Sequence, residues 1–157
     1  MPKITPFLWF DNNAEEAMNF YASIFKDSKV VSIFRHRGDG MGAAGRVFSA
    51  TFRLQGQEFI ALNGGPHFKF TPAISLFVSC ETQQEVDELW DKLCAGGAPN
   101  RCGWLTDKFG LSWQIVPRAL GEILQDADAA KANRVMQAML NMIKLDIAGL
   151  LQAYDQP

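Results

Sequence analysis

The sequence lacks an excess of charge of either sign. Its 15 Lys and Arg stand against 17 Asp and Glu, which leaves a formal net charge of -2. Proteins that bind nucleic acid or an anionic membrane usually carry a basic patch, so we expect neither partner. The sequence also lacks an apolar run long enough to cross a bilayer, and residues 1–4 show no signal-peptide core. These absences predict a cytoplasmic protein.

Cysteine and histidine are scarce as well. The three cysteines, Cys80, Cys94 and Cys102, form no CxxC pair and leave one over. This pattern argues against a disulfide framework or a zinc knuckle and favours a reducing compartment. The two histidines, His36 and His67, lie in or beside predicted loops, and a role at a pocket rim fits His67 better. No base and nucleophile pair is visible, so the sequence names no catalytic residue.

What the chain does contain is apolar residues, at 48% of 157 positions, enough for the core of one globular domain over 1–157. The most specified stretch is CGWLTDKFGLSWQIVP at 102–117. Its glycines and final proline divide it into two short aromatic runs, which predicts a β-hairpin with Asp107 in the turn. Gln114 points away from the packed face, either as a hydrogen-bonded sheet residue or as part of a pocket wall.

The first half of the chain has a β-α-β-β-β pattern. Strands are predicted at 3–10, 29–35, 47–54 and 58–62. After the first strand, with Asp11 in the turn, apolar residues recur with the spacing of one helical face at Ala17, Phe20, Tyr21, Ile24 and Phe25. Asn13 and Glu16 are spaced as the capping pair of this helix.

The same order returns in the second half. A strand at 73–79 precedes a helix that Thr82 and Glu85 would cap and Gly96 would end. The apolar stripe of this helix is Val86, Leu89, Trp90, Leu93 and Cys94. Cap and stripe both repeat the first helix at an offset of 69 positions (86 minus 17 and 82 minus 13).

A cap and a stripe that repeat in register indicate two copies of one unit. We therefore predict an α+β fold of two βαβββ modules, at about 3–66 and 72–118, with a shared cavity between their curved sheets. A helical segment at about 120–155 closes the chain, and one side of it carries Met136, Met139, Leu140, Ile143, Ile147, Leu150, Leu151 and Tyr154. This side either packs on the core or forms the interface of a homodimer.

The glycine-rich stretch at 38–45 lies between two predicted strands. No helix follows it whose N-terminus could receive a phosphate. We interpret it as a hairpin loop or a pocket flap, and we expect no nucleotide cofactor. The chain also lacks the alternating strands and helices of a doubly wound methyltransferase.

Four stretches carry a resemblance to a known family: ITPFLWFDNNAEEAMNFY, ISLFVSCETQQEVDELW, the hairpin at 102–117 and KLDIAGLLQAY. Together with the duplicated pattern, they resemble the PhnB-like branch of the vicinal oxygen chelate superfamily, the glyoxalase, bleomycin-resistance and extradiol-dioxygenase fold. Many members of this branch carry the label 3-demethylubiquinone-9 3-methyltransferase. The resemblance implies paired βαβββ modules, a cup-shaped pocket and a homodimer.

The resemblance also implies where a metal would bind. Enzymes of the superfamily hold a divalent metal with His, Glu or Gln from four strands, and the matching positions here are Thr5 or Pro6, Ala61, Ser75 and Gln114. Only Gln114 has a side chain that could coordinate. Because catalytic metal sites normally need about three protein ligands, we expect no metal at this site and no other cofactor.

Strand alternation and the resemblance together give the candidate ligand-pocket residues Trp9, Phe48, Phe52, His67, Phe68, Phe70, Trp104, Trp113 and Gln114. Each aromatic residue among them could instead belong to the core. We expect a protein that binds a small apolar or aromatic molecule without a metal. The alternatives are an enzyme acting on a small metabolite, either a methyltransferase or a lyase or isomerase of the glyoxalase type, and an interaction module whose pocket has filled.

Overall fold

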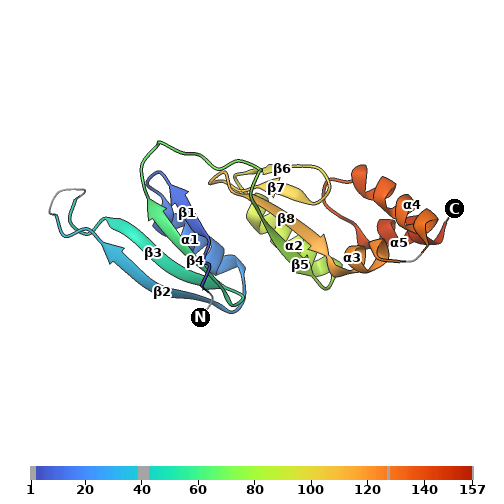
Figure 1. Ribbon diagram of the computed structural model, residues 1–157, viewed down its shortest axis with the longest axis horizontal. Helices are drawn as coiled ribbons and strands as arrows, with labels where there is room; N and C mark the ends of the chain where they lie inside the picture. The colour runs from blue at the N-terminus through green and yellow to red at the C-terminus, as the bar shows by residue number, and fades with distance from the viewer. Residues whose placement is uncertain (1–2, 39–42, 127, 157) are drawn as a thin grey trace. The chain divides into compact units, whose positions relative to one another are not determined.

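The computed structural model describes residues 3–38, 43–126 and 128–156. It divides the chain into two compact units, Met1–Phe70 and Thr71–Pro157, each with one four-stranded sheet (Figure 1). Across these described ranges, none of the helices has the length and hydropathy that crossing a bilayer requires. The expected flap at 38–45 includes residues 39–42, which lie outside the described residues.

The first unit contains, in order, β1 (Phe7–Phe10), α1 (Ala14–Ile24), β2 (Ser28–Arg35), β3 (Val47–Leu54) and β4 (Gln57–Asn63). The strands lie in the order β1-β4-β3-β2, with β1 parallel to β4 and the other pairs antiparallel. Between β3 and β4, Gln55 and Gly56 have φ of 52° and 82°. Two successive positive φ values are what a two-residue hairpin turn requires, so β3 and β4 are joined by a tight hairpin.

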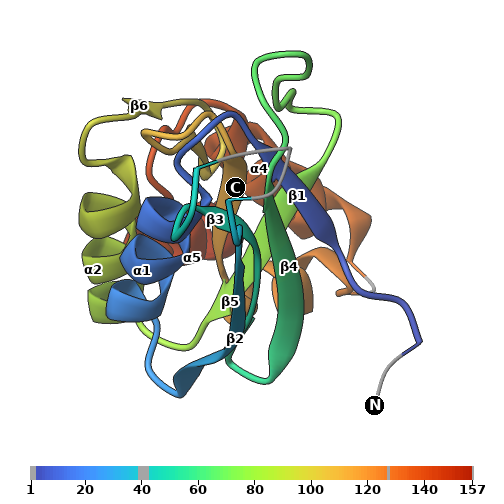
Figure 2. The same cartoon turned by 90° about the vertical axis from the view of Figure 1, so that its left-hand side faces the viewer.

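Helix α1 covers one side of this sheet, as Figure 2 shows. The ring of Tyr21 stacks on Phe52 at a centroid distance of 6.4 Å, and Phe52 stacks on Phe59 at 5.5 Å. Alternate strand residues therefore point at the helix and form the core. The remaining residues of each strand form the open face of the sheet.

The second unit repeats this arrangement with β5 (Ser75–Cys80), α2 (Gln83–Cys94), β6 (Ala98–Pro99), β7 (Trp104–Thr106) and β8 (Ser112–Pro117). The strand order is β5-β8-β7-β6, with β5 parallel to β8, so the topology matches the first sheet strand for strand. The predicted α+β fold of two βαβββ modules is confirmed. The hairpin expected at 102–117 is the antiparallel pair β7 and β8.

The two predicted helix caps have different outcomes. The Thr82 and Glu85 cap of α2 is confirmed, because the Glu85 backbone N–H donates to Thr82 Oγ1 at 3.1 Å. The expected cap of α1 by the Asn13 side chain is wrong, since that side chain makes no cap hydrogen bond. Asn63, at the end of β4, accepts from the Ala14 N–H at 2.9 Å instead. A cap supplied from 49 residues away cannot be read from local spacing.

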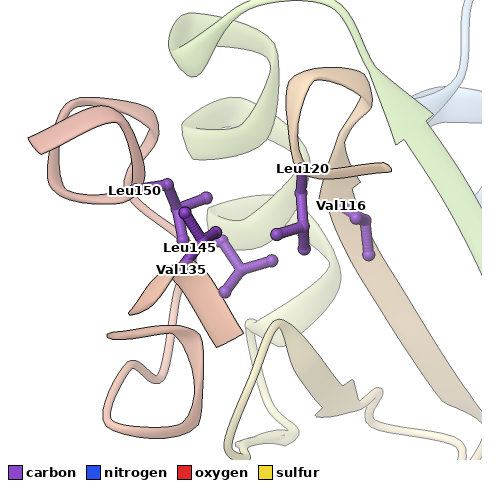
Figure 3. Packing of buried hydrophobic residues seen from close by; sticks show 5 residues of the cluster. All are labelled: Val116, Leu120, Val135, Leu145 and Leu150. Atoms are coloured by element: carbon purple, nitrogen blue, oxygen red, sulfur yellow. The ribbon is translucent and has the colours of Figure 1, made fainter. Parts of the chain in front are cut away.

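Three helices occupy the C-terminal region where the sequence predicted one segment: α3 (Arg118–Leu124), α4 (Ala129–Leu140) and α5 (Ile147–Asp155). Asp128 and Asp146 cause the restarts, because their carboxylates accept backbone N–H groups of the first turns of α4 and α5. Each interruption resets the helical phase. The buried cluster of Figure 3 is accordingly Val116, Leu120, Val135, Leu145 and Leu150. Of these, the expected stripe included only Leu150.

The side chain of Gln83 anchors the C-terminal helices to α2. Its Nε2 donates to the Leu145 carbonyl at 3.0 Å, and its Oε1 accepts from the Ile147 N–H at 2.7 Å. On the hairpin side, the Cys102 and Gly103 N–H groups donate to two carbonyls in the link between α4 and α5, each at 2.8 Å. The three C-terminal helices are therefore an integral part of the second unit.

Candidate functional site

The open face of the first sheet can be traced from the strand register. Residues paired across neighbouring strands point to the same side of a sheet. Trp9 pairs with Leu62, and Leu62 pairs with Ser49. Phe52 faces α1 and lies three positions after Ser49 on β3, so the two side chains point to opposite faces of the sheet. The row of Trp9, Leu62 and Ser49 therefore lies on the open face.

A pocket of about 480 Å³ lies at the end of the first sheet where β1, β2 and β4 finish and β3 begins. It belongs wholly to the first unit, and its lining consists of Trp9, Asp11, His36, Arg46, Val47, Phe48, Leu62, Asn63, Gly64, Gly65 and Pro66. Aromatic and aliphatic side chains therefore meet several polar groups in one hollow, as is usual in small-molecule sites.

A β-bulge places Phe48 in this pocket. The register pairs Phe34 with Ser49 and Arg35 with Val47, so Phe48 is an extra residue on β3. Bulges commonly redirect a side chain next to a site. The Phe48 ring lies edge-on to Phe34 at 5.8 Å and to His36 at 5.3 Å. These contacts hold the ring in place on the wall of the pocket.

Trp9 is fixed on the opposite wall. Its Nε1 donates to the Gly65 carbonyl at 2.9 Å, and its ring lies edge-on to Phe68 at 5.0 Å. A Cβ atom on Gly64 would lie 2.3 Å from the indole, so the backbone can approach Trp9 only because this residue is glycine. The loop after β4 and the end of β1 thus form one rigid edge of the pocket.

The polar groups come from the strand ends. The His36 N–H donates to the Arg46 carbonyl at 2.8 Å, which continues the pairing of β2 and β3 and makes His36 and Arg46 cross-strand neighbours. Asn63 Nδ2 donates to the Val47 carbonyl at 3.0 Å while Oδ1 caps α1. Asn63 therefore ties the helix start to the pocket wall.

Two of the candidate residues proposed from sequence line this pocket, namely Trp9 and Phe48. A third, Phe52, is 0% exposed and packs between α1 and the sheet. Phe52 is a core residue, because its position on β3 puts it on the face that α1 covers. Alternation along this strand predicts two faces, but it does not say which face the helix covers.

Three further candidates lie in the segment after β4. Phe68 is exposed and touches Trp9, while Phe70 lies edge-on to Phe10 at 5.2 Å. His67 is exposed in the same loop. None of these three lines the pocket, but Phe68 supports one of its walls through Trp9.

The last three candidates belong to the second sheet. Trp113 is buried, and its Nε1 donates to Asp107 Oδ2 at 2.9 Å, so it is a core residue. Trp104 and Gln114 are paired and partly exposed on the face away from it. Gln114 Nε2 donates to Ser75 Oγ at 2.9 Å. Gln114 is therefore a hydrogen-bonded sheet residue, which is one of the two interpretations that the sequence left open.

Sequence reasoning did not name Arg46, Leu62 and Asn63 as site residues, and it ranked His67 above His36. The missing signal was register. Arg46 comes just before a well-predicted strand, but only its pairing with His36 brings it to the pocket. No pattern along the chain reports which residues of two strands face each other.

The residues at the positions implied for the superfamily metal do not fit a divalent ion. Ala61 is buried on the side of the sheet that faces α1, paired with Ala50. Ser75 and Gln114 are hydrogen-bonded to each other. Within the part of the chain that the structure describes, no group of three or more His, Cys, Asp or Glu side chains could hold a metal. One amide oxygen with no imidazole or carboxylate beside it is a poor donor set.

Comparison with known proteins agrees with the fold. A family model described as 3-demethylubiquinone-9 3-methyltransferase matches residues 2–116. A putative 3-demethylubiquinone-9 3-methyltransferase, PhnB protein, from Bacillus cereus is 46% identical, with 74% of this chain and 99% of that chain covered and a TM-score of 0.69. The comparison with curated proteins gave no match.

Two more distant structures share the fold. Protein PA1353 from Pseudomonas aeruginosa is 18% identical over 74% of this chain and 98% of its own, with a TM-score of 0.63. The fosfomycin resistance protein FosX from Listeria monocytogenes is 15% identical over 80% of this chain and 98% of its own, with a TM-score of 0.59. At these identities the likeness concerns the fold alone.

Proposed function

We propose that this chain, which belongs to the PhnB-like 3-demethylubiquinone-9 3-methyltransferase family of the vicinal oxygen chelate superfamily, binds a small apolar or aromatic molecule. The ligand would lie in the pocket of the first unit, without the superfamily metal. The observation that carries this proposal is the hollow of about 480 Å³ with Trp9, Phe48 and Leu62 in its walls. Its volume lies within the range usual for ligand sites.

The walls are preorganised, which favours binding. Trp9 is held by its hydrogen bond to Gly65, and Phe48 is held by edge contacts with His36 and Phe34. Rings that are already fixed lose little conformational entropy when a ligand packs on them. Aromatic faces also suit a flat partner, through offset or edge contacts.

Calorimetric titration with the neutral probe 2-naphthalenemethanol tests this proposal. We expect saturable binding, and Phe48→Ala should weaken it about tenfold because the probe loses an apolar wall. The matched control is Phe7→Ala, which removes a ring 57% exposed at the other end of β1 and outside the pocket lining. Absence of binding to the unmodified protein would overturn the function, and equal losses in both variants would overturn its location.

The description of the family favours a second candidate, an enzyme that modifies a small aromatic metabolite by methyl transfer. The same pocket would then hold the acceptor, with the His36 imidazole as the candidate general base. A methyltransferase should bind S-adenosylmethionine and consume it in the presence of a phenolic acceptor such as catechol. A binding protein should give saturable binding with no product, whereas an enzyme should give product at a pH-dependent rate that His36→Gln abolishes.

We also propose a reducing, cytoplasmic location, which the state of the cysteines supports. Cys80, Cys94 and Cys102 are all free thiols. Burial raises the pKa of the Cys80 thiol to about 12, so it is inert at neutral pH. Cell fractionation with an antibody to the chain would place it directly.

A further inference from the structure

The strand register brings one arginine to the open face of the first sheet. Val47 is buried against the core, and its partner Arg35 reaches Glu15 of α1, so this pair points to the helix side. His36 and Arg46 form the next pair, joined by the 2.8 Å backbone hydrogen bond. This pair continues the strand alternation one residue beyond β2 and β3, to the face opposite Arg35 and Val47, and both residues line the pocket.

The two arginines of this strand end differ in their partners. Arg35 Nη2 lies 2.6 Å from Glu15 Oε2, and its Nη1 donates to the Gly45 carbonyl at 3.0 Å. Arg46 is exposed, and among the residues that the structure describes no carboxylate forms an ion pair with its guanidinium. Among the described residues of the lining, Arg46 is therefore the arginine that is available to a ligand.

Within the described part of the lining, the acidic residue is Asp11, and it lies on the other side of the pocket. Asp11 follows β1, whereas Arg46 precedes β3, and β4 separates these two strands. Neighbouring strands are 4.7–4.9 Å apart, so the two main chains are separated by about 10 Å. The opposite charges therefore lie on opposite sides of the pocket, with Arg46 between the end of β2 and the start of β3 and Asp11 at the end of β1.

The apolar groups lie between these two sides. Phe48 stands beside His36, Leu62 belongs to the central strand β4, and Trp9 belongs to β1. A planar molecule that packs on Phe48 and Leu62 would bring one end to Arg46. A guanidinium binds a carboxylate through two parallel N–H···O bonds, which no neutral group can reproduce.

From this arrangement we propose that the ligand is a small aromatic or flat apolar carboxylate, with its anionic group bound by Arg46 beside His36 and its apolar body on Phe48 and Leu62. The inference rests on the proposed function, because it names the ligand class of the same pocket. Arg46 is the residue that determines specificity in this assignment.

Two isosteric probes, 2-naphthoate and the neutral 2-naphthamide, separate charge recognition from apolar binding. We expect the unmodified protein to bind the naphthoate about tenfold to a hundredfold more tightly than the amide, since hydrogen bonds to charged groups are the stronger ones. Arg46→Gln should abolish this preference, with a much larger loss of affinity for the naphthoate than for the amide. Because Arg46 is exposed, the variant is expected to keep its melting temperature.

The matched control is Arg37→Gln, which removes the same charge next to His36 from a residue that does not line the pocket. It should retain the preference for the naphthoate. Equal binding of the two probes to the unmodified protein, or equal losses in the two variants, would overturn the inference while the proposed function stands. Binding of neither probe would overturn both.

Discussion

Asp107 is the residue that organises the hairpin of the second unit. Its carboxylate is only 2% exposed, and its Oδ1 accepts from the Phe109 and Leu111 N–H groups at 2.8 and 3.1 Å. Its Oδ2 accepts from Trp113 Nε1 at 2.9 Å. The sequence predicted a turn residue here, and the structure adds that the turn and the core tryptophan share one buried acceptor.

Replacing Asp107 with Ala should lower the free energy of unfolding by about 2–4 kcal/mol, because two buried donors and one partly buried donor lose their acceptor. Denaturant unfolding followed by tryptophan fluorescence measures this loss. The matched control is Asp91→Ala on the exposed side of α2, which should change stability by less than about 0.5 kcal/mol. A loss of stability for Asp107→Ala as small as that of the control would show that the Asp107 contacts are not important to stability.

At the scale of elements, α1 depends on a cap from another strand. Asn63 accepts from the Ala14 N–H and donates to the Val47 carbonyl, so one carboxamide joins a helix start to two strands. The neighbouring Asn13 occupies the N-cap position without a side-chain hydrogen bond. This difference gives a direct comparison of two asparagines.

We predict that Asn63→Ala lowers the free energy of unfolding by about 1–3 kcal/mol, since a cap and a strand contact are lost together. Asn13→Ala should cost a few tenths of a kcal/mol at most by the same principle. Thermal unfolding followed by circular dichroism compares the two variants. A larger loss from Asn13→Ala would restore the local capping pair that the sequence suggested.

The end of α5 is tethered by a second long-range contact. The Tyr154 hydroxyl donates to Asp126 Oδ2 at 2.5 Å. This hydrogen bond is the main cause that lowers the pKa of Asp126 from its ordinary 3.8, and it is also the main cause that raises the pKa of Tyr154 from 10.0. The tether is therefore sensitive to pH at both extremes.

The direction of that sensitivity follows from linkage. The contribution of Asp126 is present above pH 3.8 and is lost as the pH falls through its lowered pKa. That of Tyr154 is fully present below pH 10.0 and is lost as the pH rises through its raised pKa. Hydrogen exchange of the α5 amides, corrected for intrinsic rates, should show less protection at pH 2–3 than at pH 7.

Tyr154→Phe should reduce this pH difference, because the hydroxyl that distinguishes the two states of Asp126 is gone. Asp155→Asn is the control, since it removes a nearby charge and keeps the hydrogen bond. If Tyr154→Phe and the unmodified protein showed the same dependence on pH, another group would control the end of this helix.

At the scale of the whole molecule, we propose that the chain forms a homodimer, as the family resemblance implies. Among the described residues in and between the last two helices, three large apolar side chains are exposed, namely Leu140, Ile143 and Leu151. Exposed apolar groups of this kind are common at subunit interfaces. The sequence placed these residues on one apolar side, either packed on the core or at the interface of a homodimer, and the structure leaves these three exposed in the protomer.

Light scattering after size-exclusion chromatography should give the mass of a dimer for the unmodified protein. Ile143→Asp should give a monomer that remains folded, because this side chain is 55% exposed within the protomer. Val135→Asp should instead unfold the second unit, since an unpaired carboxylate would be buried in its core. A monomeric unmodified protein would overturn the dimer, and a dimeric Ile143→Asp would place the interface elsewhere.

The sequence alone determined the repeated unit and the order of its elements. The features that allowed this are local: hydrophobic periodicity, turn residues and the Thr82 cap each involve residues only a few positions apart in the sequence. The resemblance added the fold family. The same local reasoning failed at 120–155, where Asp128 and Asp146 interrupt a stripe that looks continuous in the sequence.

Tertiary structure decided which of these residues meet. Two features depend on the strand register, namely the bulge at Phe48 and the pairing of His36 with Arg46. A third, the cap that Asn63 supplies to α1, joins positions far apart in the chain. Phe52 is a core residue because α1 covers its face of the sheet, whereas Trp9 lies on the other face and lines the pocket. Periodicity along one strand gives two faces but not which is covered, because that depends on the packing of the other elements.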